Sequence, residues 1–140
     1  CWKIVHKQYI FLPLNLYDHS GISMSTLSFV GRAQHAEWDS GQVGWIYISK
    51  ENAVKEWGKT RFTKAVEAKA VKYLIGEVKT YDDYLVGNVY GYRVCDEDGE
   101  VLESCWGFYP EHGDSSGYGY CLKEAKSMAG QLLAIAQAQE

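Results

Sequence analysis

Residues 43–57 read VGWIYISKENAVKEW, and this stretch passes directly from a strand pattern to a helix pattern. Residues 43–48 are the clearest β-strand in the chain, because β-branched and aromatic residues dominate them. Ser49 can cap a helix over residues 50–57, since its hydroxyl can accept a hydrogen bond from the first turn. Gly58 is expected to end that helix. The stretch therefore predicts a strand followed at once by a short helix.

Two further strands are expected before this stretch. Residues 9–17 are mainly apolar, and Pro13 favours an edge position because proline donates no hydrogen bond to a neighbouring strand. Residues 22–29 alternate apolar with small polar side chains. The sequence DHSG at 18–21 is typical of a turn, so the two strands should form a hairpin. After an irregular loop at 30–37, the sequence WDSGQ at 38–42 predicts another turn.

Helical spacing follows Gly58. Thr60 can cap a second helix. Its core-facing positions recur three and four residues apart and are Phe62, Val66, Ala70, Tyr73 and Leu74. Gly76 is expected to interrupt this helix. Residues 77–85 should then resume it, with Gly87 and Asn88 at its end.

A second hairpin is predicted from residues 89–95 and 101–109, joined by a turn at Asp98 and Gly99. In the register of a two-residue turn, Gly91 lies opposite Trp106, and a large ring that covers a strand glycine stabilises a sheet. Residues 120–139 should close the chain as a helix. Its apolar stripe, which would pack on the sheet or on another copy of the chain, is Leu122, Ala125, Ala129, Leu132 and Ala136.

Together these elements predict one α+β domain over residues 1–140. Two hairpins and a central strand should form an antiparallel sheet of about five strands, accompanied by three to four helices. The composition, 46% hydrophobic and 23% charged, is that of a globular protein. No apolar run is long enough to span a membrane and the start lacks a signal-peptide pattern, so we expect a cytoplasmic protein.

Cys95 and Cys105, two of the four cysteines, are expected to be free thiols. The chain has no C-x-x-C, so the spacing of a zinc ribbon is absent. In the hairpin, Cys95 should face Leu102 and Cys105 should face Tyr92, which places the two thiols on opposite sides of the sheet. A bulged turn would place them on one side of the sheet but roughly 13 Å apart. A disulfide between them is therefore not expected with either turn.

Charge is unevenly distributed along the chain. Residues 1–74 carry a net charge of +4, residues 75–114 carry −8, and residues 115–140 are neutral. The lysines are interleaved with glutamates, which is typical of a solvated helix face, so we do not expect direct nucleic-acid binding. The acidic hairpin could bind a basic partner surface through Asp96, Asp98 and Glu100, with Trp106 beside them. The alternative, which charged hairpin tips favour in general, is a tip that keeps the protein soluble and blunts a strand edge.

A second polar cluster combines the two N-terminal turn sequences. Its candidate ligand-binding residues are Asp18, His19, Ser20, Trp38, Asp39, Ser40 and Gln42, flanked by Trp45. A Ser, His and Asp set could be assembled from it, but no G-x-S-x-G elbow surrounds either serine. The alternative is that these side chains close turns through bonds to the backbone. Adding His35 produces no standard metal-ligand spacing, so we expect neither a metal nor a cofactor.

Several of these sequences occur together in a known family. They are YDHSGI at 17–22, WDSGQVG at 38–44, GEV at 76–78, VYG at 89–91 and SCWGFY at 104–109. In order and spacing, residues 9–109 resemble a family of small proteins carried by bacteriophages and other bacterial mobile elements. Residues 30–37 depart from the family pattern, which is usually shorter there, and the C-terminal helix lies outside it. The resemblance implies a setting rather than a reaction, and it supplies no catalytic residue.

The leading hypothesis is a non-enzymatic accessory protein that binds a host component, such as part of a restriction or CRISPR defence system. The alternative is a small-molecule binding or sequestering protein, or a small hydrolase, that uses the cluster around His19 and Asp39. A third is a homo-oligomer formed through the C-terminal helix.

Overall fold

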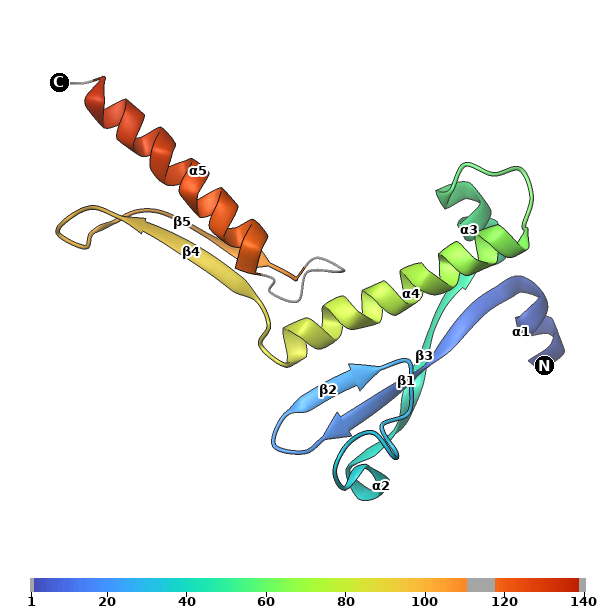
Figure 1. The fold of residues 1–140 in the computed structure, drawn as a ribbon. Coiled ribbons are helices and arrows are strands. Elements are labelled where there is room, and N and C mark those ends of the chain that lie inside the picture. The colour runs from blue at the N-terminus through green and yellow to red at the C-terminus, as the bar shows by residue number, and fades with distance from the viewer. Residues whose placement is uncertain (1, 111–117, 139–140) are drawn as a thin grey trace. The chain divides into compact units, whose positions relative to one another are not determined.

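The structure is a computed structural model that describes residues 2–110 and 118–138. These residues form five helices and five strands (Figure 1). In chain order they are α1 (Trp2–Gln8), β1 (Tyr9–Asp18), β2 (Ile22–Ser25), α2 (Ala36–Asp39), β3 (Ser40–Ser49), α3 (Lys50–Glu56), α4 (Lys64–Leu85), β4 (Tyr90–Cys95), β5 (Val101–Phe108) and α5 (Tyr118–Gln137). The predicted α+β class and its five antiparallel strands are confirmed, and the strands are divided between a sheet of three and a sheet of two.

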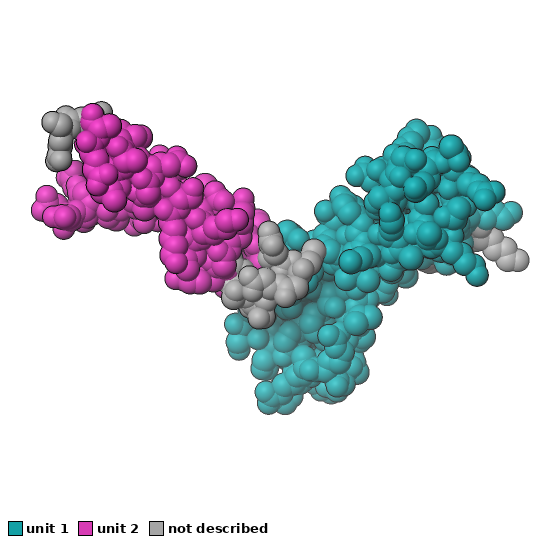
Figure 2. Space-filling view, turned by 45° about the horizontal axis from the view of Figure 1, so that its top comes forward, with its two compact units in different colours: residues 1–86 teal, residues 87–140 magenta. Residues whose placement is uncertain are grey.

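The chain divides into two compact units, residues 1–86 and residues 87–140, which Figure 2 colours separately. We call them unit 1 and unit 2. Unit 1 carries eleven Lys or Arg and nine Asp or Glu, whereas unit 2 carries three and nine. Unit 2 is therefore strongly acidic, with a net charge of −6. One folding domain over the whole chain stays a prediction.

The sheet of unit 1 has the strand order β2-β1-β3, and both pairings are antiparallel. Strand β1 is thus central rather than at an edge. However, β2 pairs only from Asn15 onward, so Pro13 has a single neighbouring strand, β3. The missing N–H of Pro13 is tolerated because the ladder to β2 has not begun at that position.

The core of unit 1 lies between this sheet and two helices. Ile10 from β1 packs with Ala53 from α3 and with α4, whose buried contributors are Val66, Ala70 and Leu74. As predicted, Ser49 caps α3, where its hydroxyl accepts a hydrogen bond from the Asn52 amide at 3.0 Å. The helix ends before Gly58, which has a positive φ of 58°.

Helix α4 is longer and begins later than the sequence predicts. Its cap is Thr63 rather than Thr60, because the Thr63 hydroxyl accepts from the Val66 amide at 3.3 Å. Gly76 does not interrupt it, so that prediction is wrong. Leu74 and Val78 are both buried on the same helix face, and this packing outweighs the cost of about 1 kcal/mol for a glycine inside a helix.

The segment between β1 and β3 also differs from expectation. Strand β2 ends at Ser25, so the predicted strand over residues 22–29 is only half formed. Residues 38–42 are not a turn: Trp38 and Asp39 complete α2, and β3 starts at Ser40. The ladder with β1 extends to the pair Tyr17–Ser40, which draws these polar residues into the strand.

Unit 2 is a hairpin of β4 and β5 with α5 packed on it. The predicted pairs Gly91–Trp106 and Tyr92–Cys105 are confirmed. The prediction that Cys95 faces Leu102 is wrong, because a register shift after Val94 pairs Cys95 with Val101. Cys95, Cys105 and Cys121 are free thiols.

Helix α5 packs through a face that overlaps the predicted stripe only at Ala125 and Leu132. The side chains that are buried or half-buried there include Cys121, Ala125, Met128 and Leu132. Of the predicted stripe, Leu122, Ala129 and Ala136 are exposed. Both sets recur at helical spacing, so the periodicity could not distinguish them.

Candidate functional site

The two polar clusters of unit 1 meet at one end of its sheet. Asp18 ends β1 and residues 19–20 follow it, whereas residues 36–39 precede β3, its antiparallel partner (Figure 1). The end of one antiparallel strand lies beside the start of the next, so the clusters are brought together. Their direct contact is a hydrogen bond of 2.7 Å between His19 Nδ1 and Asp39 Oδ2.

Aromatic rings surround this pair. The Tyr17 ring is stacked on His19 at a centroid distance of 5.9 Å and on Phe29 at 5.3 Å. The Tyr17 hydroxyl donates to the carbonyl of Gln34 at 2.9 Å, and the His35 ring lies 5.7 Å from that of His19. His35, which the sequence offered only as an additional metal ligand, thus lies beside the cluster through its ring.

Two residues of the cluster have a left-handed backbone conformation although neither is glycine. Ser20 has φ 59° and His35 has φ 55°. Such conformations cost of order 1 kcal/mol or more and are enriched at functional sites. They also occur in ordinary tight turns, so they do not by themselves identify a site.

The other predicted residues of this cluster do not converge on the pair. The Ser40 hydroxyl donates to the Ala36 carbonyl at 2.6 Å, and the Gln42 amide nitrogen donates to the Gly44 carbonyl at 3.3 Å. Asp18 and Ser20 are exposed, and Trp38 is 89% exposed. What the cluster offers chemically is an imidazole oriented by a carboxylate, an arrangement that supports proton transfer at Nε2. Among the described residues, no group of three or more His, Cys, Asp or Glu could hold a metal ion.

One carboxylate of the acidic turn in unit 2 stabilises the turn itself. Asp96 Oδ1 accepts hydrogen bonds from the amides of Asp98 at 3.0 Å and Glu100 at 2.8 Å. Asp96 therefore closes the turn between β4 and β5. Asp98 and Glu100 are exposed, so their carboxylates face solvent.

Trp106 is exposed to solvent, yet its ring is in close contact with neighbouring residues of the hairpin. Its side chain is 64% exposed. The ring covers Gly91 so closely that a Cβ added there would lie 2.2 Å from Trp106 Cε3. The guanidinium of Arg93 lies 5.7 Å from the centroid of the same ring. Sequence analysis did not single out Arg93, although the alternation of a strand places it on the same face as Gly91.

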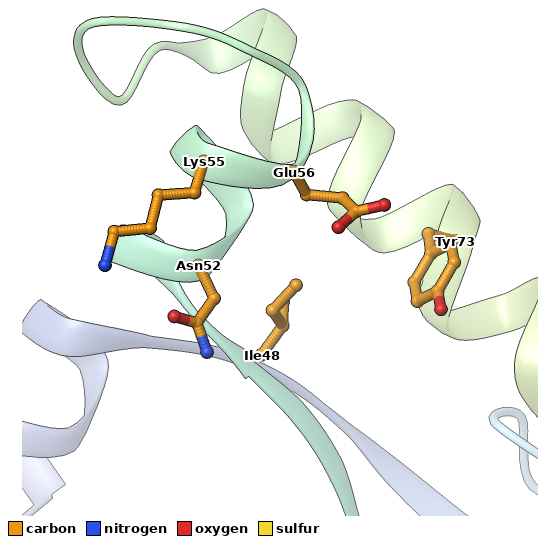
Figure 3. Close-up of a pocket in the computed structure, with 5 residues that line it drawn as sticks. All are labelled: Ile48, Asn52, Lys55, Glu56 and Tyr73. Atoms are coloured by element: carbon orange, nitrogen blue, oxygen red, sulfur yellow. The ribbon is translucent and has the colours of Figure 1, made fainter.

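Two cavities of unit 1 lie away from these clusters. Figure 3 shows the first, of about 510 Å³, lined by Ile48, Asn52, Lys55, Glu56 and Tyr73. In this view Glu56 extends toward Tyr73, whereas Lys55 extends to the opposite side.

Neighbours on the same helix already engage two of the polar groups around this cavity. Lys55 pairs with Glu51 at 2.6 Å and lowers the pKa of that carboxyl. The hydroxyl of Tyr73 is hydrogen-bonded to Glu77, which raises the pKa of the phenol. These groups are therefore not poised for a ligand.

The second cavity, of about 440 Å³, lies between β2, the loop after it and α4. Asp82 joins these elements. Its Oδ1 accepts from the Ser23 hydroxyl and from the Met24 amide, both at 2.7 Å. Sequence analysis missed Asp82, because its partners lie 58 and 59 residues away in the chain.

Within the described residues, no helix is long and apolar enough to cross a membrane. Comparisons with protein-family models, with curated proteins and with solved structures found no match.

Proposed function

We propose that the chain is a non-catalytic accessory protein of a bacteriophage or mobile element, and that its β4–β5 hairpin binds a basic surface of a host protein. The observation that carries the proposal is Trp106, an exposed ring held in place by Gly91 and Arg93 on the hairpin that ends in the acidic turn. The setting comes from the family resemblance of residues 9–109.

The held tryptophan supports binding to a protein. Tryptophan and arginine are the residue types most enriched among those that dominate interface energies. A side chain that is already fixed loses less conformational entropy on binding than a mobile one does. The Trp106 ring, held against Gly91 with the Arg93 guanidinium over it, therefore supplies a pre-organised apolar contact on the hairpin.

The charge of unit 2 supports a basic partner. Glu97, Asp98 and Glu100 are exposed around the turn, and no ion pair involves them among the described residues. A cluster of one sign accelerates association with a surface of the opposite sign and disfavours acidic partners. A host protein with a surface for nucleic acid, as in restriction and CRISPR systems, has the required charge.

The test is capture of a host protein from bacterial lysate by the intact chain, followed by measurement of its affinity for the purified partner. We expect the double variant Asp98→Lys with Glu100→Lys, and separately Trp106→Ala, to lose the partner while keeping the wild-type circular dichroism. Asp96 is left unchanged because it closes the turn. The double variant Glu37→Lys with Glu67→Lys, which changes the net charge equally at two exposed positions of unit 1, is the matched control and should bind normally. Undiminished affinity in both hairpin variants would refute the proposal.

A second candidate function is small-molecule binding or hydrolysis at the cluster of unit 1. The observation that favours it is the contact of 2.7 Å between His19 and Asp39, which leaves Nε2 of the imidazole available as a base. Hydrolysis of p-nitrophenyl acetate by the intact chain tests it. Activity that is lost in both His19→Asn and Asp39→Asn would support it, whereas equal rates in all three proteins would exclude a role for this pair.

A further inference from the structure

We propose that unit 1 contains a small-molecule site in the cavity of about 440 Å³ between β2, the loop of residues 26–32 and α4, and that its ligand is a small carboxylate with an apolar body. Cavities of roughly 300–1,000 Å³ are the usual size of small-molecule sites. Every residue that lines the cavity belongs to unit 1, so the inference is independent of the function proposed for the hairpin of unit 2.

The apolar part of the cavity comes from three segments. Val78 on α4 is only 5% exposed, and Met24 from β2 and Phe29 from the loop are half-buried. Leu27 and Ile75 also line the cavity and are exposed large hydrophobic residues. A ligand with an aliphatic or aromatic body would remove these side chains from water, which is favourable in proportion to the apolar area covered.

Some charged side chains that line the cavity already have hydrogen-bond or ion-pair partners within the chain. Asp82 accepts two hydrogen bonds of 2.7 Å that attach β2 to α4. Lys79 Nζ lies 3.3 Å from Oδ2 of Asp83, a buried carboxylate on the same helix. The side chains of Asp82 and Lys79 are therefore already engaged in contacts within unit 1.

Arg32 is the remaining cation. Among the described residues it forms no ion pair, and the hydrogen bond of its side chain is from Nη1 to the Ser28 carbonyl at 3.3 Å. A guanidinium has five N–H donors, so most of them stay available to a ligand. The site thus combines an apolar floor with the Arg32 guanidinium and with the Asp82 carboxylate, whose Oδ1 is already bonded to β2.

This donor set favours a carboxylate over a phosphate. The planar guanidinium matches the two oxygens of a carboxylate through parallel hydrogen bonds. Phosphate sites usually add several backbone amides. Here the amide of Met24 is bound to Asp82, that of Leu27 to the Ser25 hydroxyl at 3.0 Å, and that of Val30 to the Ser28 hydroxyl at 3.2 Å.

The experiment compares two probes with the same ring, 1-naphthoate and 1-naphthalenemethanol, by calorimetric titration into the intact chain. We expect saturable binding of 1-naphthoate, with the neutral alcohol about tenfold weaker, since a hydrogen bond to a charged group is worth about that factor. Arg32→Gln should weaken 1-naphthoate by about tenfold and leave the alcohol unchanged. Lys55→Gln, which removes a cation from the other cavity, is the matched control and should change neither affinity.

A second variant tests the cavity without touching the charge. Ile75→Trp adds bulk at an exposed position of the lining and should weaken both probes equally. Equal affinity of the wild-type chain for the two probes, an unchanged 1-naphthoate affinity in Arg32→Gln, or no saturable binding by folded protein would each overturn the proposal. None of these results depends on whether the hairpin captures a host protein.

Discussion

The ring of Trp106 lies against the backbone of Gly91, its partner in the β4–β5 ladder. Three ring atoms, Cε3, Cδ2 and Cγ, are within 2.9 Å of the position that a Cβ on residue 91 would occupy. No side chain other than hydrogen fits there without moving the ring. The glycine is therefore what allows an exposed tryptophan to lie flat on its own sheet, and this geometry leads to the first prediction.

Gly91→Ala should displace Trp106 and destabilise the hairpin by about 1–3 kcal/mol, the usual cost of inserting a methyl group into an occupied space. Urea unfolding followed by circular dichroism gives the free energy, and the indole N–H resonance of Trp106 reports the displacement. Gly41→Ala in β3 is the control, because nothing lies within 4 Å of its added Cβ. Equal effects of the two substitutions would show that the ring is not confined by Gly91.

Asp96→Ala should loosen the turn between β4 and β5. It removes the acceptor of two backbone hydrogen bonds and should cost about 1–3 kcal/mol locally. Hydrogen exchange at the amides of residues 98 and 100 should accelerate. Asp98→Ala removes an equal charge from the same turn but no acceptor of these bonds, so exchange there should stay slow. Unchanged exchange in Asp96→Ala would mean that the carboxylate does not hold the turn.

Leu74→Ala should destabilise unit 1 by about 2–5 kcal/mol, because it leaves a cavity in the core. Leu74 is 3% exposed and packs with Ile10, Ala53 and Val66. Ile75→Ala, at the next position of α4, removes the same type of side chain from a site that is 45% exposed and should cost less than about 1 kcal/mol. Thermal unfolding of both variants provides the measurement. A loss at residue 75 as large as that at residue 74 would contradict the assignment of the buried face.

The hydrogen bond between Tyr73 and Glu77 should be visible in a spectrophotometric titration. The carboxylate raises the pKa of the phenol above its ordinary value of 10.0. The signal of Tyr73 is isolated as the difference between wild type and Tyr73→Phe at 295 nm. Glu77→Gln should move its midpoint toward lower pH, and an unmoved midpoint would exclude the contact.

The same pKa shift predicts how stability depends on pH. A phenol whose pKa is raised in the folded state stabilises the fold at pH values below the unfolded pKa of about 10, and that contribution is lost as the pH rises through the folded value. Unfolding free energies of wild type and Tyr73→Phe should therefore converge above pH 10. Curves that stay parallel would show that the hydrogen bond contributes nothing.

Local patterns in the sequence predicted much of the fold correctly. The strand before Ser49, the cap at Ser49 and the stop at Gly58 all depend on residues within one or two turns of each other. The pairing of Gly91 with Trp106 followed from the turn that separates the two strands. The register shift next to that turn did not, because a bulge depends on how the paired strands twist.

The candidate site was predictable as a list of residues but not as a geometry. The two polar clusters were identifiable by composition, and the antiparallel pairing of β1 with β3 brought His19 to Asp39. The same pairing drew Ser40 and Gln42 into the strand, where both side chains bond to nearby carbonyls. Composition alone could not distinguish the residues that meet in the cluster from those that bond to the backbone, since the same side-chain types occur in turns, strands and binding sites.

By itself, the sequence determined the α+β class, the five strands and the acidic character of residues 75–114, because these depend on local propensity and on charge. Only the tertiary structure decided which face of α5 is covered, whether α4 continues through Gly76, and that Asp82 attaches β2 to α4. Each of these rests on contacts between residues far apart in the chain, whose packing and hydrogen bonding outweigh local preferences of about 1 kcal/mol.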